Sequence, residues 1–239
     1  MKDKVYIASG AGFSGDRFDA AVPLVEYLSK CEGPKYLIFE VLAERTIALA
    51  QAEKIVNPEA GYSPYLEKYL MPILRQIKEY HIKIVTNMDA ANPVAAARRI
   101  NELAVELGLP PFKISVLLGD DLSTYLDKGT ILSSPTVKGN PIAGRSLKAA
   151  NVYLGGDSVA KALEKNVDIV IVGRTTDSAL ALGPLIYEFG WANDDWNKLA
   201  AGTICGHWLE CGAQVTCAYF SDPGFKDVPD LSEVGFPIA

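Results

Sequence analysis

Six residues near the start of the chain, Gly10-Ala11-Gly12-Phe13-Ser14-Gly15, fill a G-x-G-x-x-G frame directly behind an apolar run at residues 5–8. A glycine loop that leaves a buried strand can bring bare backbone N–H groups against an anionic ligand, with a helix N-terminus behind it. Two charged residues, Asp16 and Arg17, follow at once, and an ordinary nucleotide loop does not need them there. The pattern therefore predicts a small-molecule site close to the N-terminus.

Polar or charged residues also follow the other apolar runs that we expect to form strands. The full set of candidates is Ser9, Gly10, Gly12, Ser14, Gly15, Asp16, Arg17, Glu40, Glu44, Arg45, Asn87, Asn92, Gly119, Asp120, Gly173, Arg174 and Asp177. Because ligands of parallel α/β proteins bind at the carboxyl ends of the strands, we expect these residues to converge. The predicted catalytic residues are Asp16, Arg17, Glu40, Arg174 and Asp177, and the others are predicted to bind substrate. The alternative is that Asn92 and Asp177 only cap helices.

Glu40 is the most informative of these candidates. It stands inside the apolar run 36–41, where an unpaired carboxylate would be costly. We therefore expect a partner such as Arg17 or Arg174. A buried carboxylate–arginine set at the strand ends can serve as an acid or base and as a clamp for a substrate carboxylate or phosphate.

A dinucleotide site is the first alternative, because Glu40 follows the glycine loop at a spacing near that of a ribose-binding acid. An NAD(P)-dependent oxidoreductase would use the loop from Gly10 to Gly15. However, Asp16 is unfavourable beside a pyrophosphate, and the helix is predicted to begin late, with Pro23 in its first turn. A Ser-His-Asp hydrolase is disfavoured, because the sequence has no G-x-S-x-G and only two histidines, of which we expect His207 to be packed.

The composition excludes several function classes. The chain has 239 residues and a net charge of −6, which argues against nucleic acid as a partner. It has no apolar run long enough to cross a membrane and no signal-peptide core at its start, so we expect a cytoplasmic protein. The four cysteines show no metal-site spacing, and we expect them to be free and buried and the protein to have no metal centre. A Mg²⁺ ion at Asp120-Asp121 is a weaker alternative.

The elements that must position these residues alternate along the chain. Strands are predicted at 5–9, 36–40, 82–86, 113–118, 168–172 and 214–220, and helices at 20–30, 43–52, 65–80, 94–107, 158–165, 178–189 and from about 195 to 211. Near-continuous apolar strands separated by helices predict an open, mostly parallel sheet with helices on both faces, a Rossmann-like three-layer α/β fold. A partial or closed β/α barrel is the alternative. We expect one domain over 1–239, with an irregular excursion or lid around 129–150.

Several motifs of the chain are distinctive when taken together. They are residues 9–17, 40–46 and 85–93, the segment from Gly173-Arg174 to Asp177, and residues 206–214 and 222–229. In these motifs the chain resembles the acyclic terpene utilisation family. The resemblance spans the chain and implies that it corresponds to the N-terminal half of a typical member.

The resemblance implies a catabolic role, with lyase-like or hydratase-like chemistry on a branched hydroxy acid or its CoA thioester. The expected partner is thus a small organic acid or acyl-CoA. The sequence assigns no cofactor, and a CoA thioester would enter as substrate. NAD(P) and Mg²⁺ are the weaker cofactor alternatives. We also expect a homo-oligomer or association with a separate C-terminal half. In a further alternative, the chain is a non-catalytic half that supports a partner chain.

Overall fold

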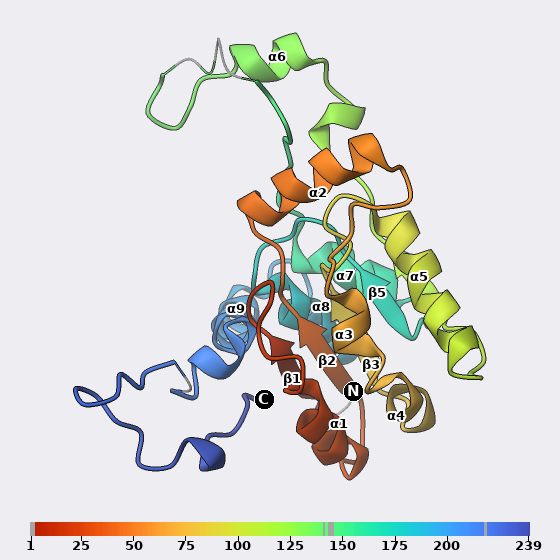
Figure 1. The fold of residues 1–239 in the computed structure, drawn as a ribbon, viewed down its shortest axis with the longest axis vertical. Coiled ribbons are helices and arrows are strands. Elements are labelled where there is room, and N and C mark those ends of the chain that lie inside the picture. The colour runs from red at the N-terminus through yellow and green to blue at the C-terminus, as the bar shows by residue number, and fades with distance from the viewer. Residues whose placement is uncertain (1–2, 141, 143–145, 218) are drawn as a thin grey trace.

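The computed structural model of the chain describes residues 3–140, 142, 146–217 and 219–239. Its centre is a five-stranded sheet in which every pair of neighbouring strands is parallel. The strand order is β1-β2-β3-β5-β4, and Figure 1 labels the first four of these strands. The strands are β1 (Tyr6–Ala11), β2 (Lys35–Phe39), β3 (Lys83–Thr86), β4 (Ile114–Val116) and β5 (Ile169–Ile171).

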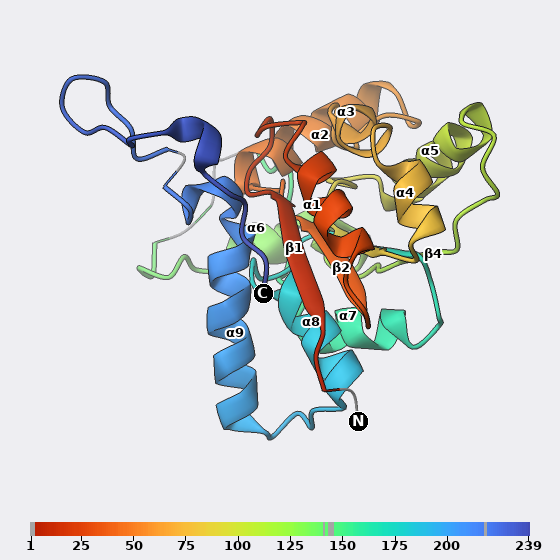
Figure 2. The same ribbon diagram turned by 90° about the horizontal axis from the view of Figure 1, so that it is seen from below.

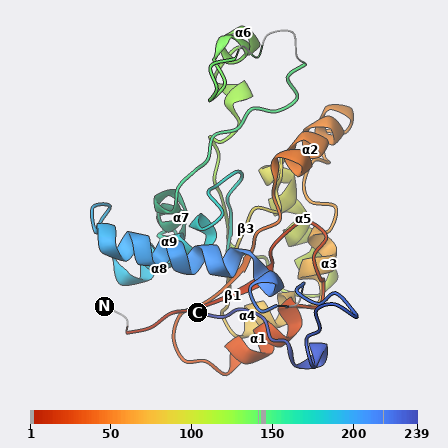
Figure 3. The same cartoon turned by 90° about the vertical axis from the view of Figure 1, so that its left-hand side faces the viewer.

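Helices cover both faces of the sheet, which explains why its inner strands are apolar on both sides. The helices are α1 (Ala21–Ser29), α2 (Glu44–Val56), α3 (Leu66–Leu70), α4 (Leu74–Glu79), α5 (Pro93–Glu106), α6 (Lys128–Ser133), α7 (Gly156–Leu163), α8 (Ala179–Phe189) and α9 (Trp196–Glu210). One buried cluster joins the sheet to α1, α3, α4 and α5, and a second joins it to α7, α8 and α9. Figure 3 shows the resulting three layers.

The sheet is open, so the prediction of a three-layer α/β fold is confirmed and the barrel alternative is wrong. β1 and β4 form the two edges of the sheet and do not pair with each other. Residues 237–239 instead lie antiparallel along the outer edge of β1, where the backbones of Ile7 and Ala239 exchange two hydrogen bonds (Figure 2). This contact covers backbone groups that an edge strand otherwise leaves open.

Two of the predicted elements are wrong. The helix expected over 65–80 is divided into α3 and α4, because Pro72 lacks the N–H that a continuous helix needs. The strand expected at 214–220 does not form over the described part of that stretch. A single 3₁₀ turn, Gly212–Gln214, followed by further turns, takes its place, and Ala218 lies outside the described residues.

The predicted helix caps give a mixed result. Asn92 caps α5, and its side-chain oxygen accepts the N–H of Ala95 at 3.4 Å. Asp177 does not cap α8, which begins after Ser178 without a side-chain cap. Asp177 is therefore available for another role.

The excursion predicted around 129–150 projects from the body of the protein and carries α6 at its far end (Figures 1 and 3). Pro141 and residues 143–145 of this segment lie outside the described residues. Over the described ranges, no helix has the length and apolar character needed to cross a membrane.

Candidate active site

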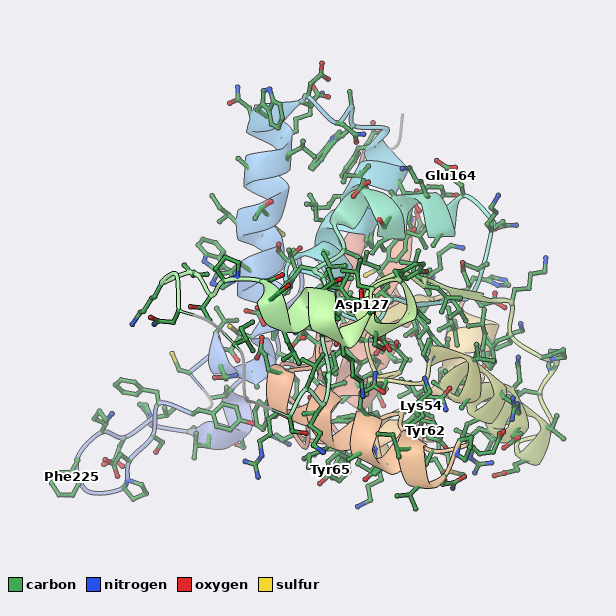
Figure 4. All side chains as sticks on the ribbon, turned by 90° about the horizontal axis from the view of Figure 1, so that it is seen from above. Lys54, Tyr62, Tyr65, Asp127, Glu164 and Phe225 are labelled. Atoms are coloured by element: carbon green, nitrogen blue, oxygen red, sulfur yellow. The ribbon has the colours of Figure 1, made fainter. Side chains whose placement is uncertain are left out.

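α2 lies across the carboxyl edge of the sheet, and three cavities border it. The first, of about 330 Å³, lies between Glu44, Arg174 and the excursion. The second, of about 170 Å³, is bordered by Ser14 and Asn87. The third, of about 200 Å³, lies beside Asp120. Figure 4 views this edge from above, with Lys54, Tyr62 and Tyr65 labelled near α2. Cavities therefore surround α2 at the carboxyl edge of the sheet, where the candidate residues were predicted.

The glycine loop after β1 binds a carboxylate of its own chain. The Asp16 carboxylate is 3% exposed and accepts the N–H of Gly12 at 3.0 Å and the N–H of Arg17 at 2.8 Å. The hydroxyl of Tyr219 donates to the same carboxylate. An anionic ligand would have to displace Asp16 to reach the Gly12 N–H. In this structure Asp16 therefore organises the loop.

Close packing accounts for two of the glycines in the loop. A Cβ on Gly10 would lie 2.5 Å from the ring of Phe39, and one on Gly12 would lie 2.5 Å from the backbone carbonyl of Cys211. The loop is thereby pressed against the C-terminal end of α9. Arg17 points away from this contact, since its half-exposed guanidinium forms an ion pair with Asp19.

Glu40 extends from the end of β2 into a buried position and is 6% exposed. Burial raises the pKa of its carboxyl to about 7, although a hydrogen bond from Asn87 opposes the shift. Asn87 Nδ2 donates to Oε1 at 2.7 Å, and the Leu42 N–H lies 3.4 Å from the same oxygen. No cation pairs with Glu40 among the residues that the structure describes. The expectation of an Arg17 or Arg174 partner is therefore wrong.

A second buried carboxyl, Glu210 at the end of α9, lies near Glu40. Burial raises the pKa of Glu210, and the nearby charge of Asp177 raises it further. The charges of Asp177 and Glu210 also raise the pKa of Glu40. Cys211 donates its thiol hydrogen to Glu210 Oε1 at 3.1 Å, and His207 Nδ1 lies 3.3 Å from the same oxygen. Burial, with this hydrogen bond, raises the pKa of the Cys211 thiol to about 11.

Glu210, His207 and Cys211 were not among the site residues predicted from the sequence. His207 was expected to be packed, but its side chain is 69% exposed and turned toward Glu210. The expectation that the four free cysteines are buried is likewise wrong, because Cys31, Cys205 and Cys211 are only half-buried and Cys217 is exposed. These three residues could have been predicted from the motif 206–214, which contains them and carries part of the family resemblance.

Arg174 is the buried cation at this edge, and its side chain is 8% exposed. One guanidinium nitrogen donates to the Leu42 carbonyl at 2.6 Å, and another donates to Glu44 at 3.0 Å and to the Tyr153 hydroxyl at 2.7 Å. Asp177 lies 3.8 Å away. Arg174 therefore ties the end of β5 to α2 and to the segment that returns from the excursion, and it borders the first cavity.

The remaining candidates occupy different positions along the edge. Ser9 is buried in β1, Gly15 adopts a left-handed turn, and Arg45 is exposed and borders none of the three cavities. Gly119, Asp120 and Asn92 border the third cavity. Glu44 borders the first cavity, and Gly173 begins the turn that carries Arg174. The structure thus brings Glu40, Asn87, Glu210 and Asp177 into one group and leaves Arg17 and Arg45 outside it.

Comparison with known proteins gives a match to a protein family. The model of a protein family described as "Acyclic terpene utilisation family protein AtuA" matches residues 5–239, essentially the whole chain. No curated protein and no solved structure matches the chain with significance.

Proposed function

This chain belongs to the acyclic terpene utilisation family, and from that premise we propose that it is a catabolic enzyme with lyase-like or hydratase-like activity. The proposed substrate is a branched hydroxy acid or its CoA thioester. The main support for the proposal comes from Glu40 at the carboxyl end of β2. Its carboxyl is buried, and its pKa is raised to about 7. A group with that pKa both accepts and releases protons near neutral pH.

The proposed chemistry needs one base and one acid. When water is eliminated next to an acyl carbonyl, a base removes the proton from the α-carbon while an acid protonates the departing hydroxyl, and a carbon–carbon double bond forms. Ionised Glu40, oriented by Asn87, is the proposed base. Glu210, whose pKa is also raised, is the proposed acid. Two carboxyls held in one buried group with raised pKa values provide such an acid–base pair.

Arg174 is the proposed binding group for the anionic part of the substrate. Its guanidinium borders the first cavity and is held by Glu44 and Tyr153, so its position is fixed before a ligand binds. A planar guanidinium can bind a carboxylate or a phosphate through two hydrogen bonds.

The dinucleotide alternative is weakened by the glycine loop. Asp16 takes the Gly12 N–H, and α1 begins only at Ala21, several residues beyond Gly15. A change in NADH fluorescence on titration with the protein would restore this alternative.

A supporting role for a partner chain is the second candidate function, and exposed apolar side chains on α9 favour it. Trp196, Ile204 and Trp208 are all more than half exposed and follow one another at helical spacing. Association of a second chain would cover this stripe. Light scattering of the isolated chain, with Trp208→Ser as the comparison, would detect self-association through it.

The catalytic proposal is tested by turnover. The full chain is assayed with branched 3-hydroxyacyl-CoA thioesters, the corresponding 2,3-unsaturated thioesters and the free acids, by the ultraviolet absorbance of the unsaturated thioester and by chromatography for the acids. Glu40→Gln is expected to lower turnover by about 100-fold or more. Glu59→Gln is the matched control, because Glu59 is exposed and pairs with Arg98. Equal turnover by Glu40→Gln and the wild type would overturn the assignment.

A further inference from the structure

Two more buried carboxyls lie near each other, one in the loop after β3 and one in the loop after β4. Asp89 is 1% exposed and Asp120 is 7% exposed. Two consecutive backbone N–H groups hold them: Gly173 donates to Asp89 Oδ1 at 3.2 Å, and Arg174 donates to Asp120 Oδ2 at 2.9 Å. Gly173 has a φ of +63°, and a Cβ there would lie 2.8 Å from the Asp120 carboxyl. The turn after β5 is therefore shaped around this pair.

Two buried oxygens at this site accept no hydrogen bond from the described residues. Asp89 Oδ2 is buried and accepts no hydrogen bond within the described ranges, and the same holds for Asn151 Oδ1. Asn151 is nonetheless anchored, because its Nδ2 donates to Asp120 Oδ2 at 3.0 Å. Buried polar atoms in proteins are nearly always paired, since leaving one unpaired is costly. Unsatisfied oxygens on adjacent acidic and amide side chains point to a positively charged ligand.

The neighbouring side-chain cations are engaged elsewhere. Lys54 borders the same cavity, but its ammonium group donates to the Ala91 carbonyl at 2.7 Å. The guanidinium of Arg174 is directed to Leu42, Glu44 and Tyr153. In the described part of the protein, the repulsion between the two carboxylates is therefore not offset by a side-chain cation.

We propose that Asp89 and Asp120, with the amide oxygen of Asn151, bind a divalent cation that prefers oxygen ligands, such as Mg²⁺, Ca²⁺ or Mn²⁺. Carboxylate and amide oxygens suit these ions. Mg²⁺ bound by two protein carboxylates commonly completes its coordination with water and with anionic groups of a ligand. The adjoining cavity of about 200 Å³ has room for both.

Asp121, the residue after Asp120, is already held by other groups of the chain. Both oxygens of Asp121 are occupied, because Oδ2 accepts from the Gln51 amide at 3.0 Å and Oδ1 accepts from the N–H and hydroxyl of Ser123. The proposed site therefore combines carboxylates from two strand ends rather than two consecutive residues.

A proton is the competing occupant of the site. Burial, together with the charge of Asp120, raises the pKa of Asp89 to about 7. The other charged groups around the cavity are Asp121 after β4 and Lys54 on α2, with Arg174 after β5 in contact through its backbone.

Calorimetric titration of the full chain, freed of metal with a chelator, tests the proposal with MgCl₂, CaCl₂ and MnCl₂. At about pH 8 we expect one ion bound per chain. Asp89→Asn and Asp120→Asn are expected to weaken binding by more than about tenfold. Asp157→Asn is the control, because Asp157 is partly exposed on α7 and pairs with Lys161.

Two results would overturn the proposal. One is the absence of binding by the wild type at millimolar concentrations of all three ions, which would leave the pair sharing a proton. The other is equal binding by folded Asp89→Asn and the wild type, with folding checked by circular dichroism. If the variants do not fold, the stoichiometry of the wild type decides, because adventitious surface binding would not give one ion per chain. The outcome is independent of the role of Glu40.

Discussion

Replacing Glu40 by glutamine is expected to stabilise the protein, and to do so more strongly as the pH rises. Burial raises the pKa of the carboxyl from an ordinary value of 4.5 to about 7 in the folded state. The folded protein therefore binds this proton more tightly than the unfolded chain does. The stability that the proton contributes is present at low pH and is lost as the pH rises from about 4.5 to about 7.

The expected magnitude follows from the two pKa values. Their difference, about 2.5, corresponds to about 3 kcal/mol of unfolding free energy once the folded carboxyl has ionised, at about 1.4 kcal/mol for each pKa unit. The amide preserves the local hydrogen bonds, because Asn87 and Leu42 both donate to Oε1 and a glutamine Oε1 accepts the same bonds. The variant thus removes the cost of the buried charge and little else.

Urea denaturation at a series of pH values measures this effect. We expect the variant and the wild type to be about equally stable near pH 4, and the variant to be more stable by about 3 kcal/mol near pH 8. Glu59→Gln, on an exposed side chain, provides the control with no such trend. A difference that does not change with pH, or a less stable Glu40→Gln near pH 8, would refute the reasoning. A gain in stability together with a loss of turnover is typical of residues kept for function.

Three further outcomes follow from the glycine loop and the cysteines. Asp16→Ala leaves buried N–H donors unpaired and should lower the unfolding free energy by about 2–4 kcal/mol in urea denaturation. Gly12→Ala should lower the thermal midpoint, with a cost of about 1–3 kcal/mol, because its Cβ meets the Cys211 backbone, whereas Gly235→Ala meets nothing and should leave the midpoint unchanged. Mass spectrometry should find that iodoacetamide alkylates exposed Cys217 well before Cys211, whose pKa of about 11 keeps it a thiol at neutral pH.

The sheet could be predicted from the sequence because its strands are continuous apolar runs separated by helices. The same pattern placed Glu40 in an apolar setting at a strand end, and the structure finds it buried there. The break between α3 and α4 was also visible as Pro72, a residue that interrupts a helix whatever surrounds it.

Other features depend on contacts between distant parts of the chain. The stretch 214–220 has strand-like composition, but Gly212 turns with a φ of +56° and packs against Gly12, some 200 residues earlier in the chain, which fixes a turn instead. The direction of the Arg174 side chain likewise depends on Glu44 and Tyr153, which the fold brings to it. Local propensity contains no information on such contacts.

In the proposed reaction, Glu40 moves a proton at the carbon next to an acyl carbonyl. The most direct measurement is the incorporation of solvent deuterium at the α-carbon of a branched acyl-CoA thioester, followed by NMR in D₂O for the wild type, Glu40→Gln and Glu59→Gln. We predict incorporation by the wild type and Glu59→Gln, at a rate that rises with pH and levels off above about 7. For Glu40→Gln we predict that the rate is reduced by about 100-fold or more. Incorporation by Glu40→Gln at the wild-type rate would contradict the claim.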